Sequence, residues 1–348
     1  MTDATTDTVD LDGVQRWLAE RTDVVGSLSA KLITGGRSNL TYLLEDGGGR
    51  RFVLRRPPKG ELLPGAHDMG REYRVVEALH SGPVPVPEPI GFCDDTSVIG
   101  AAFAVTSFVD GITLRTPEDV DALAPRGRAA LTSTFAATLA ELHGVEPAIT
   151  GRDPARGTDY VARQLHTWQR QLDAAPGREL PEMRTLGISL AQRAPRQRSV
   201  AVVHGDYRLD NVLVDTEGAV LAVLDWELWT LGDRLADIGF ALCYWIEPCD
   251  ELVPLGTSPG LGGRTQFVDA YVTASDAEFD AADIDCYLAF GTWRFAAILE
   301  GVHRRNLSGA YGEGGDEDWR RFEHVVPALA ERSAEHLARV DGTRGLRS

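Results

Sequence analysis

The chain has 348 residues, of which 43% are hydrophobic and 25% are charged, as is ordinary for a soluble globular protein. Its formal net charge of −17 argues against a nucleic-acid partner, because binding to a phosphate backbone relies on clustered Lys and Arg side chains. No segment approaches the roughly 18 uninterrupted apolar residues of a membrane helix, and the acidic first residues do not resemble a secretory signal, so we expect a cytoplasmic protein with no membrane partner.

The first part of the chain has the pattern of a small β-rich lobe. Residues 10–22 predict a short helix, and the segment 31–58 contains three short β-like runs that glycine and proline turns separate. Apolar residues recur at helical spacing in 67–80, which predicts a further helix. The proline-rich segment 83–93 is expected to lack regular structure, and 101–111 is expected to form a buried strand that runs into a turn.

The rest of the chain has a mainly helical pattern. Helical periodicity is present in 118–143, 158–174, 278–304 and 317–338. The exception is 200–226, where three β-like runs flank two groups of polar residues. We therefore expect two lobes that share a cleft, the second of them larger and mainly helical.

The polar groups within 200–226 have a spacing that suits phosphoryl transfer. The motif HGDYRLDN contains Asp206 and Asn211, and Asp225 follows after a further pair of β-like runs. A hairpin of this kind is expected to bring Asp225 close to the motif. Asn and Asp oxygens suit Mg²⁺, which takes few protein ligands and leaves room for phosphate oxygens. Asp206 can then accept a proton from a substrate hydroxyl, as phosphoryl transfer requires.

The same residues carry a resemblance to a known family. HGDYRLDN resembles the H-G-D-x4-N loop of the aminoglycoside phosphotransferase and choline kinase-like family, which is related to protein kinases. The downstream segments LDWE and GDRLADIG also resemble that family, and the likeness extends over about 25–305. It is closest to the branch that is found fused to acyl-CoA dehydrogenases.

The resemblance implies an α+β, two-lobed protein-kinase-like fold. The N-terminal lobe, residues 1–107, would be a small antiparallel β lobe with one helix that binds the nucleotide. The larger, mainly helical C-terminal lobe, residues 108–348, would carry catalysis and acceptor binding.

The resemblance also implies roles for individual residues. Asp206 would be the catalytic base, and Asn211 and Asp225 would be the ligands of Mg²⁺. The residues implied to contact the nucleotide, ATP or GTP, are Gly35, Gly36, Ser38, Asn39, Arg55, Glu72, Phe108 and Leu213. Among these, the two glycines would let backbone N–H groups approach phosphate oxygens.

Arg55 departs from the usual kinase pattern. The run FVLRR lies where kinases have V-A-I-K, so that Arg55 takes the place of the phosphate-binding lysine. The only lysines, Lys31 and Lys59, lie outside this run. An arginine can still bridge a phosphate and a carboxylate, and Glu72 on the following helix is the expected carboxylate.

We therefore expect an ATP-dependent kinase that transfers the γ-phosphate to a hydroxyl group of a small molecule. The acceptor could be aminoglycoside-like, a sugar, an amino alcohol or a hydroxyacyl compound. The alternative, favoured by Arg55, is a nucleotide-binding pseudokinase with a regulatory or scaffold role. A metal hydrolase is disfavoured because histidine clusters are absent, and a protein kinase because no A-P-E-like segment follows LDWE.

The acceptor pocket is expected on the helices of the second lobe. The candidates, each of which could instead be a core residue, are Tyr160, Gln164, Trp168, Tyr244, Trp245, Trp293, Arg294 and Glu300. Arg294 and Glu300 are the most suggestive of these, because a buried charge is costly unless it is paired or used. The sequence leaves the acceptor, the choice between ATP and GTP, and the oligomeric state open.

Overall fold

The computed structural model describes most of the chain as two compact units. The described residues are 9–33, 39–57, 68–174, 177–245, 255–308 and 319–345. Unit 1 comprises Met1–Gly111 and Leu221–Glu227, and unit 2 comprises Ile112–Val220 and Leu228–Ser348. The lobe boundary expected after residue 107 stays a prediction. No helix in these described ranges is long and apolar enough to cross a membrane.

Unit 1 is built on a five-stranded antiparallel sheet with the strand order β1-β2-β3-β5-β4. The strands are β1 (Ser29–Ile33), β2 (Leu40–Glu45), β3 (Arg51–Arg56), β4 (Pro89–Cys93) and β5 (Phe103–Ser107). Three of them, β1 to β3, confirm the three β-like runs that the glycine and proline turns predicted. Val223 donates its N–H to the carbonyl of Pro85 at 2.8 Å and so ties the segment Leu221–Glu227 to this unit.

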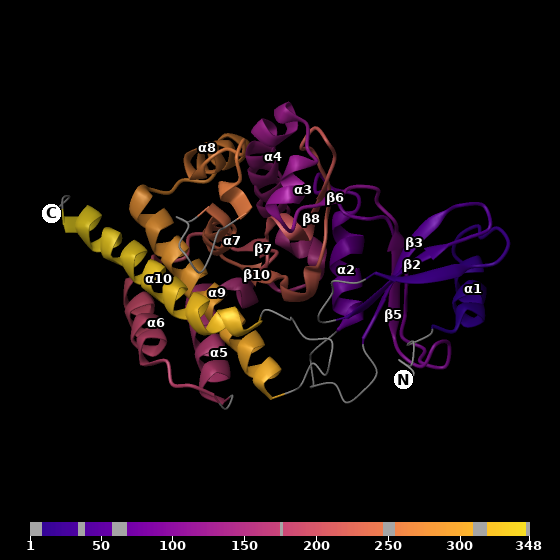
Figure 1. The fold of residues 1–348 in the computed structure, drawn as a ribbon, viewed down its shortest axis with the longest axis horizontal. Helices are drawn as coiled ribbons and strands as arrows, with labels where there is room; N and C mark the ends of the chain where they lie inside the picture. The colour runs from indigo at the N-terminus through magenta and orange to yellow at the C-terminus, as the bar shows by residue number, and fades with distance from the viewer. Residues whose placement is uncertain are drawn as a thin grey trace. The chain divides into compact units, whose positions relative to one another are not determined.

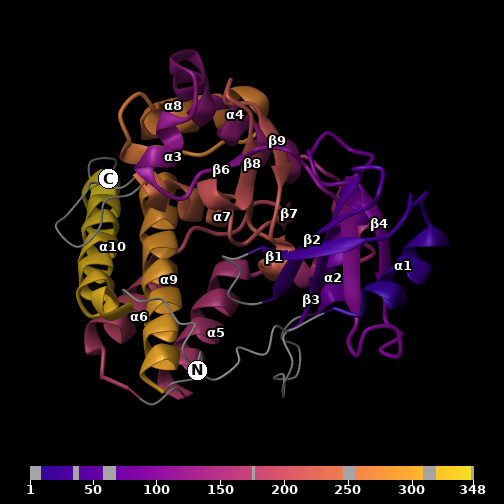
Figure 2. The same cartoon turned by 45° about the vertical axis from the view of Figure 1, so that its right-hand side comes forward.

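Helices α1 (Leu11–Ala19) and α2 (Met69–Leu79) lie on opposite faces of this sheet (Figures 1 and 2). Gly91 of β4 lies against the Trp17 ring of α1, whereas the next residue, Phe92, lies against Gly70 of α2. This follows from the strand geometry, because successive side chains point to opposite faces. The core between α1 and the sheet consists of Val14, Trp17, Leu18, Leu28, Tyr42, Leu44, Phe52, Leu54, Cys93, Phe103 and Val105.

One expectation for unit 1 is wrong. The segment 83–93 was expected to lack regular structure, but its last five residues form strand β4. Proline is tolerated there because Pro89 is the first residue of the strand and β4 lies at the end of the sheet order, where a missing N–H interrupts no inner ladder. The register shifts between Pro89 and Gly91.

Unit 2 is mainly helical, as expected. Its α-helices in the described ranges are α3 (Pro117–Asp121), α4 (Pro125–His143), α5 (Tyr160–Ala174), α6 (Pro181–Arg193), α7 (Arg234–Leu242), α8 (Arg264–Ala274), α9 (Ala281–Leu307) and α10 (Phe322–Gly345). The long helix α9 is packed against α5, α6, α7 and α10, and Figures 1 and 2 both show α10 running beside it.

The single helix expected over 118–143 is two helices in the structure. Pro125 occupies the first position of α4, where its missing N–H costs nothing, but it would break a helix that continued from α3. Helices α6, α7 and α8 lie outside the ranges for which the sequence predicts helices. In α6 the buried side chains are confined to Met183, Leu186 and Leu190, so that its apolar signal is weak.

Short strands in unit 2 hold the polar motif in place. Strand β7 (Ala201–Val203) pairs with β10 (Thr230–Gly232), and β6 (Ile112–Thr113) pairs with β8 (Val212–Val214). The motif HGDYRLDN forms the loop that leaves β7 and enters β8. Strand β9 (Val220–Val223) then leads the chain into the segment of unit 1 that contains Asp225.

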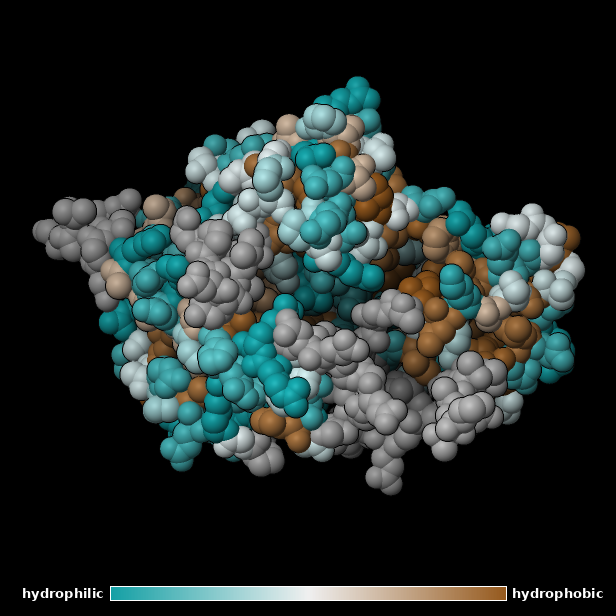
Figure 3. Space-filling view, viewed as in Figure 1, coloured by the Kyte–Doolittle hydropathy of each residue, from teal (hydrophilic) through white to brown (hydrophobic). Residues whose placement is uncertain are grey.

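The surfaces of the two units differ on the face that Figure 3 shows. Hydrophobic residues gather over the sheet of unit 1, whereas the helices of unit 2 present mainly hydrophilic residues on this face. The largely exposed apolar side chains of unit 1 include Val25 and Leu32. Unit 1 therefore exposes apolar as well as hydrophilic side chains.

Candidate functional site

In unit 1 the side chain of Arg55 joins two carboxylates. Its Nη1 lies 3.0 Å from Oε2 of Glu72, and its Nη2 donates to Oδ1 of Asp225 at 3.1 Å. Arg55 lies near the end of β3, Glu72 is in the first turn of α2, and Asp225 follows β9. The expected ion pair between Arg55 and Glu72 is present. The contact with Asp225 was not expected, because the sequence placed that residue only as a metal ligand.

Arg55 stays charged in this cluster and keeps one N–H group that can donate a further hydrogen bond. Burial alone would lower the pKa of Arg55, but the carboxylates of Glu72 and Asp225 raise it above its ordinary value. The Nε atom of Arg55 is buried and has no hydrogen-bond partner among the described residues. A buried N–H of a cation is costly to leave unpaired, so this donor suits an oxyanion such as a phosphate oxygen.

Asp225 has an unusual backbone conformation. Its φ is +61°, and Asp159, with a φ of +52°, is the other non-glycine residue with a positive φ among those described. Aspartate tolerates this left-handed region better than most residues, and such conformations persist where the surrounding structure requires them. The side chain of Asp225 is 32% exposed, so that a ligand can reach it.

The other predicted nucleotide contacts of the sequence analysis have varied surroundings. Asn39 is buried and donates its amide Nδ2 to Oε1 of Glu72 at 3.3 Å. Phe108 is half-buried, and the guanidinium carbon of Arg51 lies 4.3 Å from the centroid of its ring. Leu213 is half-buried in β8 of unit 2. Their contacts with a nucleotide stay predictions, and Gly35, Gly36 and Ser38 lie outside the described residues.

We expect Arg55→Ala to raise the dissociation constant of Mg²⁺-ATP by about 10- to 100-fold, since a charge-assisted hydrogen bond contributes about 1.5–3 kcal/mol. Arg55→Lys should retain part of the affinity, because lysine keeps the charge but loses the planar fork. Arg50→Ala is a matched control, because Arg50 precedes the same strand and donates instead to Thr22 at 2.6 Å. Calorimetric titration of the three variants measures the effect, and unchanged binding by Arg55→Ala would remove the residue from the nucleotide site.

We expect nucleotide affinity to fall as the pH drops below 7. Burial raises the pKa of Glu72 to about 7, although Arg55 lowers it. Above this pH Glu72 is ionised and orients Arg55, whereas below it Glu72 takes up a proton and the attraction weakens. One unit below the pKa only about a tenth of the groups are ionised, so that the loss at pH 6 reaches at most about tenfold.

Glu72→Gln removes the ionisable group at position 72. The pH dependence of nucleotide affinity that remains in this variant therefore comes from the nucleotide and the metal alone. Titrations of Mg²⁺-ATP at pH 6 and pH 8 should show a smaller difference for this variant than for the parent. Equal pH dependence in the two proteins would contradict the role of Glu72 in orienting Arg55.

In unit 2 the loop between β7 and β8 contains both Asp206 and Asn211. The Nδ2 of Asn211 donates to the side-chain Oδ2 of Asp206 at 2.9 Å and to its backbone carbonyl, also at 2.9 Å. The 3₁₀ turn Leu209–Asn211 brings the two residues together. An amide NH₂ group only donates hydrogen bonds, so the Oδ1 of Asn211 is the atom of that side chain that can bind a cation.

Arg208 is a further residue of this loop that the sequence analysis missed. Its Nε lies 3.2 Å from Oδ2 of Asp206 and 3.0 Å from Oδ1 of Asp210, and its Nη1 donates to the hydroxyl of Tyr244 at 3.3 Å. Burial alone would lower the pKa of Arg208, but Tyr244 and the two aspartates raise it well above its ordinary value. A permanent cation at this distance favours the ionised Asp206 that a general base needs. The signal in the sequence was a basic residue two positions after Asp206.

The backbone of the same loop is held by a buried carboxylate. Asp237 of α7 is fully buried, and it accepts the N–H of His204 at 2.6 Å and the N–H of Gly205 at 2.9 Å. Burial alone would raise the pKa of Asp237, but the side chain of His143 and the backbone bonds lower it below its ordinary value. Gly205 has a φ of +79°, and a Cβ there would lie 2.5 Å from the carbonyl oxygen of Leu228, so that only glycine fits.

The candidates for the acceptor pocket fall into two groups. The buried candidates are Tyr160, Trp245, Trp293, Arg294 and Glu300. The indole N–H groups of Trp245 and Trp293 donate to backbone carbonyls at 2.8 Å, and Glu300 pairs with Arg178 and Arg304 at 2.8 Å. These side chains belong to the core of unit 2, which is the alternative that the sequence offered for them. The candidates that are half-buried are Gln164, Trp168 and Tyr244.

The described residues contain no group of three or more His, Cys, Asp or Glu side chains that could hold a metal ion. Mg²⁺ does not need such a group, because it is usually bound by one or two protein oxygens together with phosphate oxygens and water. The Oδ1 of Asn211 and the partly exposed carboxylate of Asp225 are hard oxygen donors of this kind. Both residues stay the predicted ligands of Mg²⁺.

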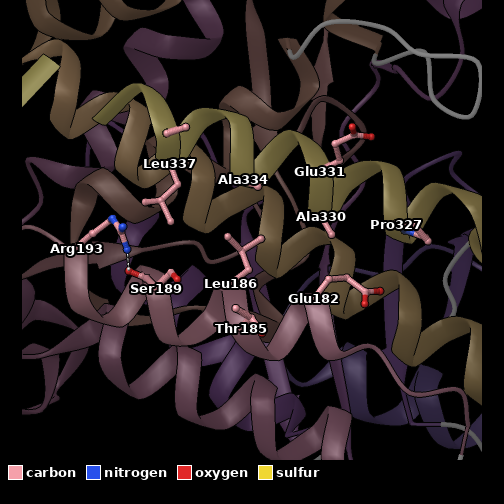
Figure 4. Close-up of a pocket in the computed structure, with 11 residues that line it drawn as sticks. Glu182, Thr185, Leu186, Ser189, Arg193, Pro327, Ala330, Glu331, Ala334 and Leu337 are labelled. Carbon is pink, nitrogen blue, oxygen red and sulfur yellow. Dashed lines mark hydrogen bonds between the residues drawn. The ribbon is translucent and has the colours of Figure 1, made fainter. Parts of the chain in front are cut away.

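Unit 2 also has a groove of about 580 Å³ between α6 and α10 (Figure 4). Its lining residues are Glu182, Thr185, Leu186, Ser189, Arg193, Pro327, Ala330, Glu331, Ala334, Leu337 and Ala338. None of the polar residues described above lines it. The groove is therefore separate from the polar loop that carries Asp206.

The sequence of this chain is similar to known proteins over most of its length. The model of the phosphotransferase enzyme family matches residues 29–282 of this chain. Acyl-CoA dehydrogenase family member 11 of Gallus gallus is 36% identical over 320 residues, which cover 89% of this chain and 40% of that relative. The chain therefore spans about two fifths of the length of this relative.

Two solved structures show the fold. A structure from Ralstonia eutropha JMP134 that carries the provisional name aminoglycoside phosphotransferase has 29% sequence identity and a TM-score of 0.80, covering 95% of this chain and 99% of that chain. A thermostable aminoglycoside phosphotransferase mutant in ternary complex with AMP-PNP and hygromycin B has 16% identity and a TM-score of 0.57, covering 92% of this chain and 99% of that chain. The likeness confirms the α+β, protein-kinase-like fold that the sequence predicted.

Proposed function

We propose that this chain, which belongs to the phosphotransferase enzyme family, transfers the γ-phosphate of ATP to a hydroxyl group of a small molecule. The observation that carries the proposal is the arrangement around Asp206. Its carboxylate is 15% exposed, accepts a hydrogen bond from Asn211 and lies beside the cation of Arg208. An ionised, oriented and still accessible carboxylate is what a general base requires.

The residues of unit 2 would act on the acceptor. Asp206 takes the proton of the acceptor hydroxyl while the hydroxyl oxygen forms a bond to the γ-phosphorus. The bond from the γ-phosphorus to the bridging oxygen breaks at the same time, and that oxygen leaves with its electron pair on ADP. The cation of Arg208 lies beside the carboxylate of Asp206, and the Asn211 amide donates to that carboxylate and so fixes its direction.

The residues of unit 1 would act on the nucleotide. Arg55 would donate its Nε–H to a phosphate oxygen, while Glu72 and Asp225 hold the guanidinium in place. Asp225, and separately Asn211 of unit 2, would each offer an oxygen ligand to Mg²⁺. When bound, this ion would neutralise charge on the phosphate oxygens.

The acceptor class that we favour is a hydroxyacyl compound. The support is the likeness to relatives that are named acyl-CoA dehydrogenases, of which this chain corresponds to a part. Tyr244 is the side chain best placed to contact the acceptor, because Arg208 holds both its hydroxyl and the carboxylate of Asp206. Trp168 offers a half-buried ring on α5, and its indole N–H donates to the amide oxygen of Gln164 at 3.1 Å.

A screen of the purified protein tests the proposal. The protein is incubated with Mg²⁺-ATP and one acceptor at a time from the hydroxyacyl, amino alcohol, sugar and aminoglycoside classes, and ADP release and product mass are followed. We expect acceptor-dependent ADP release and a product heavier by one phosphoryl group with hydroxyacyl compounds. Nucleotide binding without transfer to any acceptor would instead support the pseudokinase alternative.

A further inference from the structure

Arg294 is a buried cation that contacts the loop carrying Asp206. It lies on α9, is 2% exposed and donates from Nη2 to the carbonyl of Gly205. Its Nε and Nη1 have no hydrogen-bond partner among the described residues. Burying a charge in this way is costly unless the charge is paired or has a role. The hydrogen bond to the carbonyl of Gly205 is the contact that indicates a role.

The packing of α9 against α7 brings Arg294 to the loop. The two helices meet at Gly239 and Gly291, where a Cβ on Gly291 would lie 2.5 Å from the carbonyl oxygen of Gly239. This close approach lets both helices reach the same short segment of backbone. Helix α7 supplies the anion of Asp237, and α9 supplies the cation of Arg294.

The two buried charges bond to consecutive peptide groups of the loop. Asp237 accepts the N–H groups of His204 and Gly205, as described above. The next peptide group is held at both ends, because its carbonyl, from Gly205, accepts from Arg294, and its N–H, from Asp206, donates to Nδ1 of His204 at 3.2 Å. This peptide plane sets the direction in which the side chain of Asp206 leaves the backbone.

We infer that Arg294 is a positioning residue for phosphoryl transfer, which holds the peptide group before Asp206 so that its carboxylate faces the acceptor hydroxyl. The kinetic part of the inference rests on the proposed function. The guanidinium is itself held over aromatic rings, 4.9 Å from the centroid of Phe240 and 5.8 Å from that of Trp168. Such stacking favours a planar guanidinium over an ammonium.

The test compares three variants on the full chain. Arg294→Met removes the donor while keeping an apolar stem, and Arg294→Lys keeps a charge that can donate to Gly205 without the planar fork. Arg304→Met is the matched control, because Arg304 is a buried arginine on the same helix, 8% exposed, that donates to Glu300 and to the carbonyls of Leu172 and Arg178. Each variant is normalised to the fraction of molecules that bind Mg²⁺-ATP.

Hydrogen exchange gives a readout that needs no activity. In Arg294→Met the amides of residues 204–211 should exchange faster than in the parent, whereas in Arg304→Met they should exchange at the parent rate. On a verified acceptor, kcat per binding-competent molecule should fall by about 10- to 100-fold in Arg294→Met, with Mg²⁺-ATP affinity within twofold of the parent. Arg294→Lys should lie between Arg294→Met and the parent in both readouts.

Two results would overturn the inference. One is an unchanged exchange rate in 204–211 for both Arg294 variants, and the other is an equal fall in kcat for Arg294→Met and Arg304→Met. If the parent protein phosphorylates no acceptor, the proposed function fails, but the exchange experiment still decides whether Arg294 holds the loop.

Discussion

Asp206→Asn should lower kcat by about 10²–10⁴-fold while leaving the affinity for Mg²⁺-ATP nearly unchanged. The variant keeps the size of the side chain but cannot accept the proton of the acceptor hydroxyl. The amide oxygen of the new side chain can still accept the hydrogen bond from Asn211. Steady-state kinetics with a verified acceptor measures the loss, and calorimetry measures the nucleotide affinity.

Asp215→Asn is the matched control for this variant. Asp215 follows β8 and accepts the N–H groups of Glu217 and Ala219 at 2.9 Å, a turn that asparagine can also form. Its activity should stay within about twofold of the parent, since surface changes of this kind have small effects. An Asp206→Asn protein with the turnover of the control would show that Asp206 is not the base.

Asp225→Ala should raise the dissociation constant of Mg²⁺-ATP by about 10- to 100-fold, because it removes the carboxylate that we expect to touch the metal. Asn211→Ala should have a smaller effect, since it removes a neutral ligand. The structure adds a second consequence, because Asp225 also accepts a hydrogen bond from Arg55. Titrations with and without Mg²⁺ separate the two roles.

If Asp225 binds the metal, the loss of affinity should be much larger in the presence of Mg²⁺ than in its absence. An equal loss under both conditions would reduce its role to orienting Arg55. Asp159→Ala is a control for the release of backbone strain, because Asp159 also has a positive φ but is exposed and lies in unit 2. It should leave the affinity for Mg²⁺-ATP unchanged.

Much of the fold follows from local signals in the sequence. Glycine and proline turns separated the strands β1 to β3, and helical periodicity marked α2, α5 and α9. Strand β4 was missed because a proline-rich segment becomes a strand only through pairing with β5, a contact that local sequence does not contain. The break between α3 and α4 was readable, since Pro125 marks the first position of a helix.

Only the part of the candidate site that rests on local sequence patterns could be predicted. The pair of Arg55 and Glu72 could be expected from a strand followed by a helix, and Asp206 and Asn211 from one short motif. The bond from Arg55 to Asp225 joins residues 170 positions apart, and the bond from Arg294 to Gly205 joins residues 89 positions apart. Contacts between residues so far apart in the sequence depend on how distant elements pack, such as α7 against α9. No local sequence pattern predicts them.

The most direct test of phosphoryl transfer follows a labelled phosphate. The protein is incubated with ATP that carries ¹⁸O in its γ-phosphate, Mg²⁺ and a hydroxyacyl acceptor, and the acceptor is analysed by mass spectrometry. The account predicts that the labelled phosphoryl group appears on the acceptor hydroxyl with the parent protein, and that its rate of appearance falls with Asp206→Asn. Label found only in inorganic phosphate, or an equal rate of labelled product with Asp206→Asn, would contradict it.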